Sequence, residues 1–226
     1  MKEKSTIFAF LLMLLSTSAI AQQSDVGAWY MFFGNLKKKE SQFSLHAEAQ
    51  YRNHNFGGDL EQLLLRSGLQ YTLKDNSATL TVGYGYILSQ AEGEVNNSVA
   101  ENRIYQEAFL RQKVGGVQVF HRFRYEQRFI EGQDFRTRYR YNIFVNVPIN
   151  KKDFSQGTFY AAFYNEIFVN GQKREGVEFF DRNRLYGAAG YKLSNNTAVQ
   201  LGYMSQMLNH RSKPQLQLSL HHNLKL

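Results

Sequence analysis

Apolar and polar residues alternate one by one along most of the chain. In "QFSLHAEAQYR" (42–52), apolar side chains fall on the odd positions from Phe43 to Tyr51 and polar ones on the even positions. The segments "TLTVGYGYILS" (79–89) and "QLQLSLHHNLKL" (215–226) follow largely the same rule. Alternation with a period of two predicts β-strands that have one apolar and one polar face.

The alternation predicts eleven strands, and helical periodicity appears nowhere after residue 21. Bacterial single-chain membrane barrels have an even number of strands. Either a short first strand is hidden or the segment 26–35 is not a normal wall strand, so ten and twelve strands both stay open. The predicted strands are 26–35, 41–53, 61–73, 78–90, 102–114, 117–130, 135–149, 158–170, 181–193, 197–209 and 215–226.

Strand length and connector length indicate the class of barrel. The predicted strands have about a dozen residues, whereas globular strands usually have about five or six, and about nine to eleven tilted residues cross a bilayer. Short connectors (74–77, 115–116, 194–196) alternate with long ones (91–102, 171–181). We expect a closed antiparallel transmembrane β-barrel with about 10–12 strands, short periplasmic turns and longer extracellular loops. The alternative fold is a soluble β-barrel, whose apolar face would point inward.

The N-terminus is typical of a secretory signal peptide. Lys2 and Lys4 form a basic start, an apolar run follows, and Ala19-Ile20-Ala21 matches a cleavage site. We therefore predict a signal peptide over residues 1–21 and one β-barrel domain over residues 22–226. The chain has no cysteine, which excludes both a disulfide framework and a lipid-attachment cysteine.

The charge of the chain suggests an anionic partner. The formal net charge is +8, of which the leader contributes +1 through Lys2, Lys4 and Glu3. A basic protein can meet nucleic acid, anionic lipid or acidic ligands. Because the predicted signal peptide exports the chain, we do not expect nucleic acid as a partner.

The most basic stretch, "HRFRYEQRFIEGQDFRTRYRYNIF" (121–144), contains six arginines. They share a parity opposite to that of Phe123, Tyr125 and Tyr139, so the arginines face the lumen if the aromatic residues face lipid. An arginine facing lipid near the midplane would cost about 2–4 kcal/mol, which fixes this register. Glu166 belongs to the interior only if its strand, whose parity is ambiguous, turns it inward. The predicted lumen charge network, a candidate anion site, is Arg122, Arg124, Glu126, Arg128, Arg136, Arg138, Arg140, Arg182, Arg184, Glu48, Glu107 and Glu166.

Two interpretations of this basic interior stay open. It forms either an anion-attracting channel or binding site, or a salt-bridge network that fills a narrow barrel. In the second case, Glu126 is held among Arg122, Arg124, Arg128 and the arginines of 135–149. Glycines on the lumen parity, such as Gly83 and Gly190, either make room for long side chains or bend the sheet.

We find no catalytic motif and predict that the protein is not an enzyme. Gly-x-Ser-x-Gly does not occur, no spacing suggests a metal site, and no cofactor is expected. His46 and His221 fall on lumen parities, and Ser44 shares the face of His46. An outer-membrane lipid-modifying hydrolase, with a serine activated by a histidine, is the alternative function.

Four segments carry a resemblance to a known family. They are "DLEQLLLRSGLQYTL" (59–73), "HRFRYEQRF" (121–129), "NEIFVN" (165–170) and "DRNRLYGAAGYKLSNN" (181–196). The chain resembles the family labelled "domain of unknown function 2490", exported proteins common in Bacteroidota-type bacteria. The resemblance implies an outer-membrane barrel but no activity, and it transfers no functional residue.

These observations predict a small outer-membrane β-barrel with a basic, Arg-rich lumen. Its role is either structural or the passage or binding of small anionic solutes. The expected partners are outer-membrane lipid and, during biogenesis, periplasmic chaperones and the barrel-assembly machinery. The sequence does not define the oligomeric state.

Overall fold

The computed structural model describes residues 26–226 except 57, 94–96, 173–175 and 210. The predicted signal peptide (1–21) lies outside these residues. The described chain forms eleven strands: β1 Gly27–Lys37, β2 Phe43–Asn53, β3 Leu60–Thr72, β4 Ala78–Gln90, β5 Ser98–Val114, β6 Val117–Ile130, β7 Arg136–Pro148, β8 Phe159–Asn170, β9 Phe180–Lys192, β10 Thr197–Met207 and β11 Ser212–Lys225.

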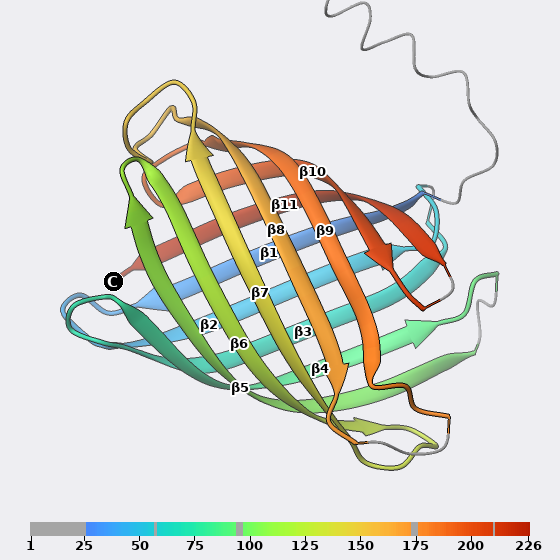
Figure 1. Ribbon diagram of the computed structural model, residues 1–226. Coiled ribbons are helices and arrows are strands. Elements are labelled where there is room, and N and C mark those ends of the chain that lie inside the picture. The colour runs from blue at the N-terminus through green and yellow to red at the C-terminus, as the bar shows by residue number, and fades with distance from the viewer. Residues whose placement is uncertain (1–25, 57, 94–96, 173–175, 210) are drawn as a thin grey trace, which may run out of the picture.

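The strands close into a single barrel in chain order (Figure 1). Each neighbouring pair is antiparallel except β1 and β11, which run parallel from Gly27↔Gln215 to Lys37↔Lys225. An odd number of alternating strands requires this, because the first and last strands then point the same way. The segment 26–35 therefore belongs to a normal wall strand, and the count is neither ten nor twelve.

Because β1 and β11 run parallel, β1 begins at one rim of the barrel and β11 ends at the opposite rim. We call one end the C-terminal rim: it holds the end of β11 and the connectors 38–42, 73–77, 115–116, 149–158 and 193–196. We call the other end the N-terminal rim: it holds the start of β1 and the connectors 54–59, 91–97, 131–135, 171–179 and 208–211. The predicted short turns all lie at the C-terminal rim, but so does the ten-residue connector 149–158, so connector length separates the rims only in part.

The alternation orients the side chains as predicted. Outward residues such as Leu80, Val82 and Tyr84 are 52%, 61% and 48% exposed. The buried residues are mostly polar or charged, and they include Glu126 and Arg138. An apolar exterior around a polar interior is the reverse of a soluble barrel, whose apolar face points inward. Among the described residues, no helix is long and apolar enough to cross a membrane.

Glycines on the inner face make room for large side chains. A Cβ on Gly83 would lie 2.3 Å from the Tyr105 ring, and a Cβ on Gly190 would lie 2.3 Å from the Tyr160 ring. Both tyrosines are almost fully buried. Of the two interpretations of these glycines, the structure therefore favours room for long side chains.

The start of β5 and the pairing of β8 with β9 differ from the sequence expectation in ways that matter for the interior. β5 begins at Ser98 rather than at residue 102, so Glu101 lies in the wall and not in a loop. The pairing of β8 with β9 shifts between Phe168 and Val169, which leaves Asp181 opposite no residue of β8. Such a bulge re-aims the side chains beside it. β11 also begins at Ser212 rather than at residue 215, so Pro214 lies within the strand.

Candidate functional site

The predicted lumen charge network lies inside the barrel. Eleven of its twelve members make ion pairs with other described residues at 2.5–4.0 Å. Arg136 shares the inward parity but makes no ion pair within the described part of the chain. Glu166 is 2% exposed and points inward, which resolves the ambiguous parity of its strand.

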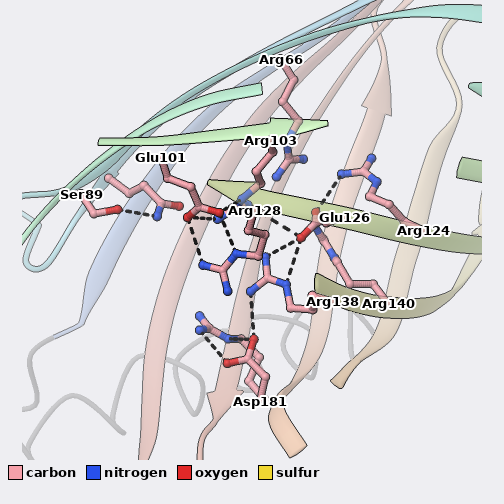
Figure 2. Close-up of polar contacts among 12 residues, drawn as sticks. Arg66, Ser89, Glu101, Arg103, Arg124, Glu126, Arg128, Arg138, Arg140 and Asp181 are labelled. Carbon is pink, nitrogen blue, oxygen red and sulfur yellow. Dashed lines mark hydrogen bonds and ion pairs between the residues drawn. The ribbon is translucent and has the colours of Figure 1, made fainter. Parts of the chain in front are cut away.

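Glu126 is the centre of the network (Figure 2). Its side chain is buried, and it lies directly opposite Arg138 in the β6–β7 ladder. Arg138 donates from Nε and Nη2 to Oε2 of Glu126 at 2.9 and 2.6 Å. Arg140 Nη1 donates to Oε1 at 2.6 Å. Both carboxylate oxygens thus accept charge-assisted hydrogen bonds, the stronger kind of hydrogen bond.

The partners of Glu126 differ in part from those expected. Arg124 and Arg103 lie at 3.9 and 4.0 Å, whereas Arg122 and Arg128 pair with other acids. The partners differ because a residue on β6 lies beside both β5 and β7. A long side chain on β6 can also contact the strand after β7. Arg122, for example, donates to Glu166 on β8 at 2.7 Å.

Two acids of the network were not predicted from the sequence. Glu101 accepts from Arg103 at 2.5 and 2.8 Å and from Arg128 at 2.6 and 3.0 Å. Glu101 shares the parity of Arg103. It was not assigned to the interior because the predicted strand began at residue 102 rather than at Ser98. Asp181 accepts from Arg138 Nη1 at 2.9 Å. It sits at the β8–β9 bulge, which simple alternation does not reveal.

These acids and arginines fill the lumen toward the N-terminal rim. We call Glu101, Arg103, Glu126, Arg128, Arg138 and Asp181 the plug network; apart from the more open Arg128 and Asp181, its side chains are at most 7% exposed. None of the six lines the main cavity of the barrel. The plug network therefore lies outside the cavity, on the side of the N-terminal rim.

A second group of charges forms the boundary between the plug network and the open part of the lumen. Arg66 Nη1 donates to both oxygens of Glu48 at 3.1 Å. Arg124 Nε donates to Glu107 at 2.6 Å. Glu166 accepts from Arg140 through both Nε and Nη2, at 3.0 and 2.6 Å.

The open part of the lumen is a cavity of about 680 Å³. Its floor includes Trp29, Arg140 and Arg184, and its lining continues to Asn35 and Asn223 near the C-terminal rim. Phe154, from the connector 149–158, contributes to the lining and packs against Tyr160 with ring centroids 5.3 Å apart. The cavity therefore extends from this floor toward the C-terminal rim.

The cavity has an excess of positive charge. Three lining residues are acidic: Glu48, Glu107 and Glu166. Eight are cationic: Arg52, Arg66, Arg111, Arg122, Arg124, Arg140, Arg184 and Lys192. Two donors on these cations, Arg122 Nε and Arg124 Nη1, are buried without a hydrogen-bond partner. The arrangement can accept an anion by charge and by hydrogen bonds.

Two arginines of the floor are held by the only tryptophan of the chain. The guanidinium carbons of Arg52 and Arg184 lie 3.9 and 4.9 Å from a Trp29 ring centroid. Arg52 makes hydrogen bonds to Gln50 and Gln62 rather than to a carboxylate. Aromatic and amide contacts orient Arg52 without neutralising its charge.

His46 and His221 face the lumen, as the alternation predicts, but the Ser44 hydroxyl is hydrogen-bonded to Gln70 and not to His46. Ser44 Oγ donates to Gln70 at 3.2 Å, and His46 contacts Asn35 at 3.2 Å and Glu48 at 3.7 Å. A different serine, Ser219, has its Oγ 3.0 Å from His221 Nε2. No group of three or more metal-ligating residues occurs among the residues that the structure describes.

Comparison with known proteins gives one match. The model of a family described as "Protein of unknown function (DUF2490)" matches residues 26–217. No curated protein matches the chain, and no solved structure does.

Proposed function

Because the chain belongs to the DUF2490 family, whose description names no activity, its function has to be inferred from its own site. We propose that the protein is an outer-membrane β-barrel that binds a small anionic solute in a one-ended lumen and does not conduct ions. The observation that carries the proposal is the cavity of about 680 Å³, which has eight cationic and three acidic lining residues and ends at the plug network.

The outer surface supports residence in a membrane. Most of the large exposed residues of the wall are apolar, and aromatic pairs lie near the strand ends. Phe43–Tyr71 and Phe159–Tyr191 flank the C-terminal rim, with ring centroids 5.2 and 4.5 Å apart. Phe129–Phe135, at 5.1 Å, lies near the N-terminal rim. Aromatic girdles at both interfaces are typical of outer-membrane barrels, and the predicted signal peptide would export the chain.

The short turns support an orientation with the cavity toward the periplasm. Lys38, Lys39, Lys151 and Lys152 lie in the connectors of the C-terminal rim, which also carries the short turns. Short turns face the periplasm in outer-membrane barrels. An anionic solute would then enter from the periplasm, past these lysines, toward the arginines of the cavity.

Electrical recording in a planar bilayer tests the closed lumen. We expect no steady conductance from the purified protein, because the plug network blocks the path. Thermal unfolding tests whether the protein binds an anion. The unfolding temperature is compared between acetate, sulfate or octanoate and chloride at equal ionic strength. A ligand at about 100 times its Kd should add about 2.7 kcal/mol of stability. Steady anion conductance, or stabilisation by none of the three, would refute the proposal.

The alternative hydrolase has one supporting observation, the contact between Ser219 Oγ and His221 Nε2. An activated serine also needs a third group that orients the histidine. His221 instead stacks on Phe33, with ring centroids 4.9 Å apart. We therefore rank binding above hydrolysis. Ester hydrolysis by the purified protein that disappears in Ser219→Ala would reverse this order.

A further inference from the structure

A continuous row of aromatic rings lines the cavity from inside. Neighbouring ring centroids are 5.3 Å apart for Phe109–Phe120, 6.4 Å for Phe109–Phe144, 5.6 Å for Phe144–Tyr164 and 4.5 Å for Tyr164–Tyr186. We call these five residues, on β5 to β9, the interior aromatic belt. All of them line the cavity, four of them keep part of their surface accessible, and Tyr186 is buried.

The belt is unexpected on the inner face of such a barrel. Barrel interiors of this class are polar, and the five residues occupy positions on the same parity as the arginines. They do not face lipid, and no described segment of the chain fills the space in front of them. Exposed apolar rings in an aqueous cavity are unfavourable unless something apolar covers them.

Two arginine donors that have no hydrogen-bond partner lie beside the belt. Phe109 pairs with Arg122 across β5 and β6, and the Arg122 guanidinium lies 5.1 Å from the Phe144 ring centroid. Arg122 Nε and Arg124 Nη1 are buried without a hydrogen-bond partner, and the nearest acids to them are Glu107 at 3.8 Å and Glu126 at 3.9 Å, beyond hydrogen-bond distance. Unused polar atoms of this kind point to a missing polar partner.

From these two features together, and resting on the proposed function, we infer that the ligand is an amphipathic carboxylate that arrives from water. Its carboxylate lies against Arg122 and Arg124, and its apolar body, an acyl chain or a ring, lies against the interior aromatic belt. The cavity volume of about 680 Å³ falls within the range of small-molecule sites. A site of this kind selects against simple inorganic anions, which leave the belt uncovered, and against neutral apolar molecules, which leave the donors unpaired.

Trp29 provides a direct signal for the test, because it is the only tryptophan and its ring lies in the cavity floor. The protein is reconstituted into phosphatidylcholine vesicles and titrated with octanoate, octan-1-ol and acetate while tryptophan fluorescence is followed. We expect saturable binding of octanoate that is at least about tenfold tighter than that of acetate, because the acyl chain covers apolar surface. Octan-1-ol should bind at least about tenfold more weakly than octanoate, because a charged hydrogen-bonded group is lost.

Variants then test the arginines and the interior aromatic belt separately. Arg122→Gln should weaken octanoate about tenfold or more and leave octan-1-ol unchanged. Phe120→Gln should weaken octanoate and leave acetate unchanged, while Phe120→Tyr should restore octanoate binding. Arg211→Gln, at the exposed N-terminal rim, should change nothing.

The outcomes separate this inference from the proposed function. Equal affinity for acetate and octanoate would refute the amphipathic ligand and leave a simple anion site. Equal affinity for octan-1-ol and octanoate would show an apolar cavity in which the arginines play no part. If no titrant binds, the amphipathic ligand is wrong, and the proposed function is wrong as well if sulfate also fails to stabilise the protein. Because the comparison of the three ligands uses the unmodified protein, it decides the matter even if a variant fails to fold.

Discussion

Glu126 and Arg138 face each other directly across β6 and β7, and Arg138 donates two hydrogen bonds to one carboxylate oxygen, at 2.9 and 2.6 Å. The other oxygen of Glu126 accepts from Arg140 at 2.6 Å. The arrangement leaves Glu126 1% exposed, with positive charge on several sides. It also ties β6 to β7 at the level where the lumen closes.

Glu126→Ala should therefore destabilise the barrel strongly. Removing one partner of a buried ion pair typically costs about 3–5 kcal/mol, because the remaining charges stay buried and unpaired. Urea unfolding of the folded protein in detergent would measure the difference. Glu92→Ala, at an exposed residue after β4, is the matched control and should change stability by less than about 0.5 kcal/mol. Equal effects of the two variants would indicate a wide, water-filled lumen.

Reversing the polarity of the outer face should impair assembly. Tyr125 is on the outer face and packs on Tyr139, with ring centroids 4.9 Å apart. Tyr125→Arg places a charge toward lipid and should cost about 2–4 kcal/mol near the midplane. The measurement is the fraction of heat-modifiable, membrane-integrated protein on gels.

Phe120→Gln is the inner-face comparison for Tyr125→Arg. Phe120 lines the cavity, so the polar replacement should fold and insert almost normally while it weakens octanoate binding. If both variants lose insertion to the same extent, the assignment of inner and outer faces is wrong.

The close approach of glycine and tyrosine inside the barrel can be tested by adding one methyl group. Gly190→Ala would place a Cβ 2.3 Å from the Tyr160 ring, and overpacking of this kind costs about 1–3 kcal/mol. Gly187→Ala meets only Phe163, at an ordinary 3.6 Å, and should be nearly neutral. Tyr160→Leu combined with Gly190→Ala should recover stability in urea unfolding. A Gly190→Ala protein as stable as the Gly187→Ala protein would contradict the proposed contact.

The parallel closure predicts a specific cross-link. Asn35 and Asn223 are register partners on β1 and β11, and their side chains share a hydrogen bond of 3.0 Å. In a chain without native cysteines, Asn35→Cys combined with Asn223→Cys should be joined by a short thiol-specific cross-linker. The product should migrate as a compact species after boiling.

Asn35→Cys combined with Gln217→Cys is the negative control for this cross-link. Gln217 pairs with Trp29, six residues along the strand from Asn35, which corresponds to about 20 Å at the usual rise. Efficient cross-linking of this second pair, and not of the first, would show that the register of the closure is different.

The sequence by itself determined the strands, their inner and outer faces and most of the interior charges. Side chains alternate strictly along a strand, so every second residue shares one environment, and the assignment of Arg122, Glu126 and Arg138 to the inside needed no partner strand. Glu101 was missed because the sequence placed a strand boundary a few residues late.

Only the tertiary structure decided how these residues combine. Ion pairs such as Arg122–Glu166 join strands that are not neighbours, and the Asp181–Arg138 pair depends on a bulge. The parallel closure follows from an odd strand count that alternation alone left open. The periodicity of a sequence specifies which face of a strand a residue occupies, but not its partner on another strand or its position along the barrel axis. The lumen therefore divides into a plug network and a basic, aromatic-lined cavity only when the sheet closes.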